Sequence, residues 1–167
     1  MNDKITLLNA ANAFLKRGSK YLLMKRAANK EVAPGVWACV GGKFEPQELN
    51  DPLAACLREV YEETGIPAER IFNLKLRYII LRRAKDTIRQ SYIYFGETDV
   101  EEVIDTNEGS LHWVPEEDLL NREYTKTFAA MMRHYLHTPV EECVVIGVAE
   151  NRGGSLYMNW SVAEDFE

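Results

Sequence analysis

Apolar residues in the first forty positions fall into short blocks separated by turn-forming residues. Ile5 to Lys16 and Tyr21 to Arg26 are apolar-rich runs, and the sequence between them reads Arg17-Gly18-Ser19-Lys20. This arrangement predicts two antiparallel strands joined by a tight turn. Val36 to Val40 then predicts a short strand that ends at Gly41-Gly42. Because glycine has no Cβ, we expect the backbone there to approach another group closely.

A helix is predicted from Pro52 to about Thr64. Asp51 suits the N-cap and Pro52 the first helical position, while Gly65 supplies a left-handed stop. At about 100° per residue, one stripe of the helix is apolar, so we expect this stripe to face the core. Its residues are Leu53, Cys56, Leu57, Val60 and Thr64.

Further along the chain, strand patterns alternate with a second helix pattern. Two long strands, Phe72 to Arg83 and Ile88 to Glu97, precede an acidic loop and a short strand from Leu111 to Val114. Residues 115–120 predict one or two helical turns. Tyr124 to His137 has the spacing of an amphipathic helix that packs on the sheet. The residues on its apolar side are Phe128, Met131, Met132 and Tyr135.

The last thirty residues predict a carboxy-terminal β-hairpin. Val144 to Val148 and Ser155 to Ser161 flank the turn-rich segment Asn151-Arg152-Gly153-Gly154. The pattern leaves three functions open for this hairpin: covering the active site, joining a homodimer, or capping the sheet.

Length and composition narrow the class of protein. The 167 residues fit a single domain, 1–167, and 46% apolar residues are ordinary for a globular protein. A formal net charge of -6 argues against binding to nucleic-acid polymers or anionic membranes. We expect no membrane-spanning segment and no secretory signal. Three widely spaced cysteines indicate reduced thiols in a cytoplasmic protein; they are Cys39, Cys56 and Cys143.

The predicted first helix carries a dense group of charged residues, namely Arg58, Glu59, Glu62 and Glu63. Carboxylates three and four positions apart project from one helix face, where they repel one another unless a cation lies among them. The apolar stripe leaves this flank available to face a site. The spacing therefore predicts a divalent-metal site.

These residues and those before them resemble the Nudix box, Gly-x5-Glu-x7-Arg-Glu-U-x-Glu-Glu-x-Gly-U, in which U is aliphatic. The matching residues are Gly42, Glu48, Arg58, Glu59, Val60, Glu62, Glu63, Gly65 and Ile66. One spacing differs, because nine residues rather than seven separate Glu48 from Arg58. The helix start at Asp51 assigns the extra pair to Leu49-Asn50, in the loop before the helix. This insertion leaves the function of Glu48 open.

The resemblance implies an α/β (α+β) Nudix fold, with a mixed β-sheet between α-helices. The core would span about residues 4–137, and the hairpin would form an extension over 138–167. The resemblance also implies metal-dependent hydrolysis of a diphosphate linkage in a nucleoside diphosphate derivative, with Mg²⁺ or Mn²⁺ as cofactor. A bound cation would neutralise charge on the phosphates and orient a water molecule.

The resemblance to this family also implies specific functions for the matching residues. Glu59, Glu62 and Glu63 would share metal binding and water activation, and Arg58 would hold a glutamate in place by charge-assisted hydrogen bonds. The Gly41 carbonyl is a further candidate ligand. Glu108 resembles a position that supplies another ligand or the general base, and the sequence does not decide between Glu59 and Glu108 for that base.

Several basic residues are candidates for binding the substrate. Arg26 and Lys43 are the predicted substrate-binding residues, although Arg26 could equally be an exposed strand end. A solvated hairpin tip is favoured over a phosphate clamp for a further basic group, Arg82, Arg83, Lys85 and Arg89.

The expected substrate is a nucleoside triphosphate, including an oxidised one, which would give a nucleoside monophosphate and diphosphate. The alternatives are ADP-ribose or another nucleotide sugar, a Nudix-fold nucleotide sensor without turnover, and a relative of isopentenyl-diphosphate isomerase. The sensor is disfavoured because the box carboxylates are present.

Overall fold

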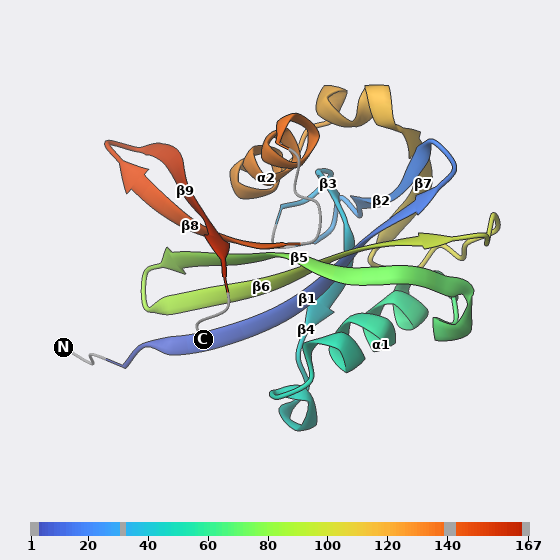
Figure 1. Ribbon diagram of the computed structural model, residues 1–167, viewed down its shortest axis with the longest axis horizontal. Helices are drawn as coiled ribbons and strands as arrows, with labels where there is room; N and C mark the ends of the chain where they lie inside the picture. The colour runs from blue at the N-terminus through green and yellow to red at the C-terminus, as the bar shows by residue number, and fades with distance from the viewer. Residues whose placement is uncertain (1–3, 31–32, 139–142, 165–167) are drawn as a thin grey trace.

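The computed structural model describes residues 4–30, 33–138 and 143–164. Figure 1 shows a twisted sheet with α1 (Pro52–Thr64) on one side and α2 (Lys126–His137) on the other. The strands are β1 (Thr6–Arg17), β2 (Lys20–Arg26), β3 (Trp37–Ala38), β4 (Val40–Lys43), β5 (Ile71–Ala84), β6 (Thr87–Thr98), β7 (Gly109–Pro115), β8 (Val144–Arg152) and β9 (Ser155–Ala163). Three short 3₁₀ turns lie at Pro46–Glu48, Ala68–Arg70 and Glu116–Asn121.

The nine strands form one mixed sheet. Its order is β3-β2-β1-β6-β5-β8-β9, with β4 paired to β1 and β7 paired to β2. The β1–β6 and β5–β8 pairs are parallel and the other pairs are antiparallel. The predicted fold class, a mixed sheet between helices, is confirmed.

Alternation along the strands divides the core into two layers. On β1, Ala11, Ala13 and Leu15 belong to the layer under α1, whereas Phe14 belongs to the layer under α2. This split follows from the two-residue period of a strand. The predicted apolar side of α2 is also confirmed, since Met131 and Met132 are fully buried.

The sequence predicted that the glycine pair follows the end of a strand. In the structure the pair lies inside a strand. The predicted strand 36–40 is divided at Cys39, and Gly41 and Gly42 lie within β4, opposite Asn12 and Ala11 of β1. A Cβ on Gly41 would lie 2.3 Å from the carbonyl oxygen of Ala11, and its φ of 138° also favours glycine. The missing side chain lets β4 continue along β1.

Helix α1 begins and ends where the sequence predicted. The Asp51 side chain accepts a hydrogen bond from the Ala54 amide, and Gly65 at the C-cap has a φ of 76°. The predicted core stripe is partly wrong, however, because Leu53 is 42% exposed while Ala55 is fully buried. At ~100° per residue, the centre of the buried arc is displaced by roughly 60° from the apolar stripe.

That rotation has a consequence for the charged residues of α1. It turns the side that carries Glu59 and Glu63 towards β4 and leaves Glu62 on the outer side. The reason is steric, because small residues, Ala55 on α1 and the glycines of β4, allow the helix and strand to approach on this side. The polar flank of the helix is therefore partly enclosed.

The predicted carboxy-terminal hairpin is confirmed and extends the sheet. Strand β8 runs parallel to β5, and β9 pairs antiparallel with β8. The Trp160 ring packs edge-on against Tyr78, with ring centroids 5.7 Å apart, and lies 4.5 Å from the His134 ring of α2. These contacts make the hairpin part of the layer beneath α2, while its participation in a homodimer stays a prediction.

The three cysteines are free thiols. Among the described residues, no helix has the length and apolar character needed to cross a membrane. The ends of the predicted domain, 1–3 and 165–167, and the start of the extension, 139–142, lie outside the described residues.

Candidate functional site

Arg58 is the centre of a charged network on α1. Its Nε donates to Glu48 Oε1 at 2.7 Å and its Nη2 to Glu48 Oε2 at 2.8 Å, so the pair is bidentate. Its Nη1 donates to both Glu59 Oε1 and Glu62 Oε2 at 3.0 Å. Nη2 also donates to the Lys43 carbonyl at 3.0 Å, which fixes the end of β4 to the helix. One guanidinium thus joins three glutamates and a strand end.

Glu48 is buried against this guanidinium, a partnership that sequence reasoning did not assign. Its exposed fraction is 7%, and it also accepts a hydrogen bond from the Glu45 amide at 2.8 Å. The bond from Arg58 lowers the pKa of Glu48 more than burial raises it. The inserted Leu49-Asn50 therefore lengthens the loop while Glu48 still reaches Arg58. The spacing of the Nudix box could have indicated that Glu48 pairs with Arg58, but the two inserted residues obscured that spacing.

Glu59 lies against the glycine strand. Only 13% of its side chain is exposed, and a Cβ added to Gly42 would lie 2.5 Å from Glu59 Oε2. Burial raises the pKa of Glu59, and the hydrogen bond from Arg58 opposes that rise. The absent side chain of Gly42 thus provides the space that the Glu59 carboxylate fills.

Glu63 is held by the neighbouring glycine. The Gly41 amide donates to Glu63 Oε2 at 2.8 Å. The pKa of Glu63 is raised to about 7, chiefly by burial and then by the negative charges of Glu59 and Glu108. The Gly41 bond and the positive charge of Arg26 act in the opposite direction. Negative charge is therefore concentrated beside Glu63.

Glu62 is the most exposed carboxylate of the helix group, with 54% of its side chain accessible. Its pair with Arg58 is an i,i+4 contact of the kind that contributes only about 0.3–0.5 kcal/mol at a surface. In the described part of the chain, no three His, Cys, Asp or Glu side chains converge as a preformed ligand set. Binding a cation between Glu59, Glu62 and Glu63 therefore requires side-chain rotation, and Glu62 can rotate at the lowest cost.

The donor chemistry nevertheless fits a hard divalent cation. The helix carboxylates offer oxygen ligands, which Mg²⁺ and Mn²⁺ prefer. Burial brings Glu59 and Glu63 together, and Arg58 pairs with Glu59 but not with Glu63. Burial is the main cause of the raised pKa of both Glu59 and Glu63, and neighbouring carboxylates add to it. A cation bound there would favour the charged form of both carboxylates.

The structure also brings Glu108 and Arg26 to this region. Arg26 ends β2 and pairs with Gly109, and the next amide, that of Ala27, donates to the Glu108 carbonyl at 2.9 Å. The Glu108 carboxylate accepts a hydrogen bond from Lys30 Nζ at 2.7 Å. By contrast, Lys43 reaches the network through its carbonyl, and its side chain is exposed.

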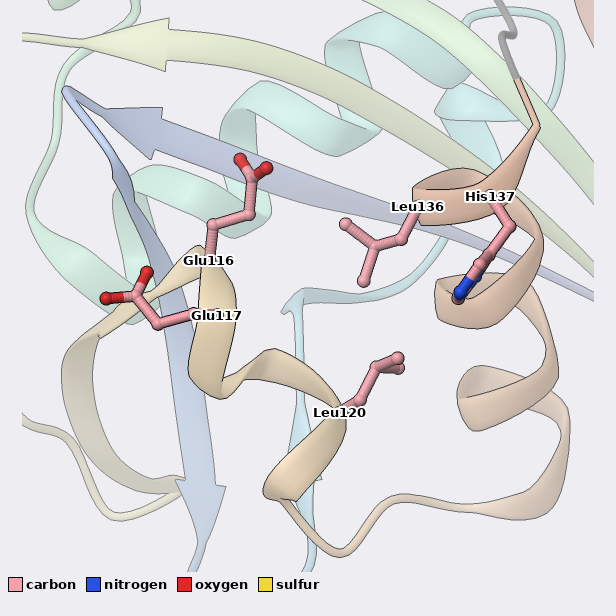
Figure 2. A pocket seen from close by; sticks show the side chains of 5 residues that line it. All are labelled: Glu116, Glu117, Leu120, Leu136 and His137. Carbon is pink, nitrogen blue, oxygen red and sulfur yellow. The ribbon is translucent and has the colours of Figure 1, made fainter.

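A hollow elsewhere on the surface contains none of these residues. It lies between the 3₁₀ turn Glu116–Asn121 and α2 and is lined by Glu116, Glu117, Leu120, Leu136 and His137 (Figure 2). Within it, the Glu116 carboxylate already accepts hydrogen bonds from Lys16 and Tyr21, each at 3.1 Å. The hollow is therefore separate from the carboxylate group on α1.

Comparison with known proteins assigns the family. The family profile of the NUDIX domain matches residues 6–135. A CTP pyrophosphohydrolase from Escherichia coli (strain K12) is 39% identical over 62 residues, which are 37% of this chain and 44% of that protein. The matched segment therefore spans less than half of that relative.

Solved structures agree on the fold. A MutT protein from Bacillus halodurans superposes with a TM-score of 0.71 at 20% identity, covering 93% of this chain and 97% of that one. A MutT protein from Methanosarcina mazei Go1 gives a TM-score of 0.65 at 22% identity, over 78% and 93% of the two chains. At these identities the likeness concerns the fold alone. With the profile match across most of its length, the chain belongs to the Nudix family.

Proposed function

We propose that this protein hydrolyses a diphosphate linkage in a nucleoside diphosphate derivative, with Mg²⁺ or Mn²⁺ as cofactor. The observation that carries the proposal is the enclosure of Glu59 and Glu63 against Gly41 and Gly42, with Arg58 fixing the surrounding glutamates. A phosphate chain repels such a group unless a cation lies between them. The arrangement thus suits a cation-bridged phosphate substrate.

The proposed substrate is a nucleoside triphosphate, cleaved to a nucleoside monophosphate and diphosphate. Support comes from the partial match to the E. coli CTP pyrophosphohydrolase, whose name specifies a triphosphate. Oxidised nucleotides belong to the same chemical class.

Each residue of the site has a distinct proposed function. Glu59, Glu62, Glu63 and the Gly41 carbonyl would hold the cation, which when bound neutralises phosphate charge and lowers the pKa of a coordinated water. Arg58 positions Glu59 and Glu62, and Glu48 anchors Arg58. Arg26, beside Glu63, would bind phosphate oxygens, and Lys43 would contribute positive charge from the end of β4.

Two residues are candidates for accepting the proton of the attacking water. Each carboxylate accepts a hydrogen bond from a basic side chain, Arg58 for Glu59 and Lys30 for Glu108. Glu59 is the more buried of the two, with 13% of its side chain exposed against 37% for Glu108, and burial raises the pKa of Glu59. A carboxylate is a stronger base near neutral pH when its pKa is raised. We therefore assign the base to Glu59 and keep Glu108 as a charge that acts on Glu63.

The test is the release of diphosphate or phosphate from CTP, an oxidised triphosphate, ADP-ribose and a uridine diphosphate sugar, with Mg²⁺ and with EDTA. Glu62→Gln and Glu63→Gln should each lower turnover by ~10³-fold while the melting temperature stays close to that of the wild type. Glu117→Gln, which lines the separate hollow, is the matched control. Undiminished hydrolysis in both helix variants would contradict the proposal, and nucleotide binding without turnover would identify a sensor.

A further inference from the structure

Two arginines lie opposite each other on the α2-facing side of the sheet. Arg89 of β6 is the register partner of Arg82 in β5 and of Leu8 in β1. Because side chains alternate along a strand, Arg89 shares its face with Ile93, which belongs to the core layer beneath α2. The pair therefore faces the α2 side, beyond the part of the sheet that packs in the core.

The two guanidiniums have no acidic partner in the described part of the chain: neither Arg82 nor Arg89 makes an ion pair or a side-chain hydrogen bond there. Arg89 is nevertheless half-buried. Like charges directly opposite in an antiparallel pair are destabilising. Burial, followed by the charges of Arg82 and Arg26, lowers the pKa of Arg89 accordingly.

Arg89 differs from the rest of the basic turn. Arg82, Arg83 and Lys85 are exposed, and Arg83 Nε donates to the Lys85 carbonyl at 3.1 Å. The prediction of a solvated hairpin tip holds for these three residues. It does not describe Arg89, because its register places it further from the turn, beside β1.

Arg26 connects the pair with the carboxylate group. Its positive charge acts both on Glu63 and on Arg89. Lys43 pairs with Ala10 of β1, and Ala10 pairs with Ser91, two residues from Arg89 on the same face. Three positive charges therefore lead away from Glu63: first Arg26, then Arg89, and then Arg82.

We propose that Arg89, with Arg82 beside it, binds a phosphate group of the substrate that lies beyond the phosphates bridged at the α1 carboxylates. A guanidinium offers five N–H donors and no acceptor, and its planar fork matches phosphate oxygens in a bidentate way. Because two such cations face each other, the ligand must be anionic. The proposal rests on the proposed function, and it selects nucleoside triphosphates over nucleotide sugars, which carry only two phosphates.

The test measures binding without turnover. Inorganic triphosphate is titrated calorimetrically in EDTA into the wild type, Arg89→Met, Arg89→Lys and Arg83→Met. Arg89→Met should weaken binding by ~10-fold, and Arg89→Lys should retain part of the affinity because it keeps the charge but loses the fork. Arg83→Met removes the same charge from the exposed tip and should change the dissociation constant less than about twofold.

Thermal unfolding separates binding from structural support. Removing one of two opposed charges should leave the melting temperature of Arg89→Met equal to or above that of the wild type. Unchanged triphosphate affinity in Arg89→Met, or an equal loss in Arg83→Met, would overturn the proposal. A fall of several degrees in Arg89→Met would also overturn it, because the residue would then be a structural one.

A second probe distinguishes phosphate from nucleobase. Cytidine carries one carbonyl acceptor and no phosphate, so its binding should not depend on Arg89. Cytidine affinity that falls in Arg89→Met while triphosphate affinity is retained would overturn the assignment. These measurements do not depend on hydrolysis. If Arg89 does not bind triphosphate, the proposed reaction can still be correct. If the protein does not hydrolyse nucleotides, the binding measurements still test Arg89.

Discussion

The two long helices cover opposite faces of one sheet, yet they differ in what they bring to the buried layer. Helix α2 buries Met131 and Met132, and the hydrogen bond between the Tyr78 hydroxyl and His134 Nδ1 joins it to the sheet. Helix α1 buries small residues and turns Glu59 and Glu63 towards a glycine strand. The amphipathic spacing of the two helices thus accounts for their packing on both faces of the sheet. The candidate site depends in addition on the close approach of α1 to β4, which occurs on one face only.

A large effect on turnover is expected from filling the space beside α1. Gly42→Ala would place a Cβ 2.5 Å from Glu59 Oε2, and a flexible side chain can move where a backbone cannot. We expect turnover to fall by ~100-fold, about 2.7 kcal/mol, because small displacements of a catalytic group have effects of this size. The melting temperature should change little. Steady-state hydrolysis and thermal unfolding measure the two quantities.

The matched change under α2 is Met131→Ala. It should lower the free energy of unfolding by ~3 kcal/mol, since Met131 is fully buried, while turnover per folded molecule stays the same. If Gly42→Ala kept full activity, or Met131→Ala lost it in the folded state, the contrast between the helices would be wrong.

A smaller effect is expected from the anchor of Arg58. Glu48→Gln should reduce the free energy of unfolding by ~2 kcal/mol at neutral pH, because it removes one partner of a bidentate, mostly buried pair. Arg58 holds the pKa of Glu48 below its ordinary value of 4.5, so this stability is present above that pH. It is lost as the pH falls through the folded-state pKa.

Urea unfolding of Glu48→Gln and the wild type between pH 7 and about pH 3 measures this dependence. The two curves should converge in acid. A difference that stayed constant over this range would show that the Glu48 charge is not the source of the stability.

The smallest effect concerns the helix starts. The Asp51 side chain caps α1, whereas the Thr125 side chain makes no capping hydrogen bond at α2. Asp51→Ala should therefore lower the free energy of unfolding by ~1 kcal/mol, and Thr125→Ala should change it by only a few tenths. Chemical denaturation of both variants measures the difference, and equal losses would remove this distinction between the helices.

The sequence predicted the features that depend on neighbouring residues. Asp51, Pro52 and Gly65 define both ends of α1 because capping involves only adjacent backbone groups. Both long hairpins follow from their turn residues in the same way. The exposure of Leu53 was missed, because it depends on how the helix is rotated against a distant strand.

The same distinction between local and long-range features applies to the candidate site. The spacing of Glu59, Glu62 and Glu63 indicated the chemistry, since helix geometry alone places them on one flank. The burial of Glu48 against Arg58 was not predictable, because an inserted pair of residues changes a loop whose path only packing determines. The half-burial of Arg89 depends equally on its pairing with β1 and β5.

By itself, then, the sequence determined where the elements begin and end and which charged groups one helix carries. The tertiary structure decided which way that helix faces. Strand β4 pairs with β1 through two glycines, and the missing side chains leave room for the Glu59 carboxylate and an amide for Glu63. Such contacts join residues far apart in the chain, so no local pattern encodes them, and folding alone brings them together.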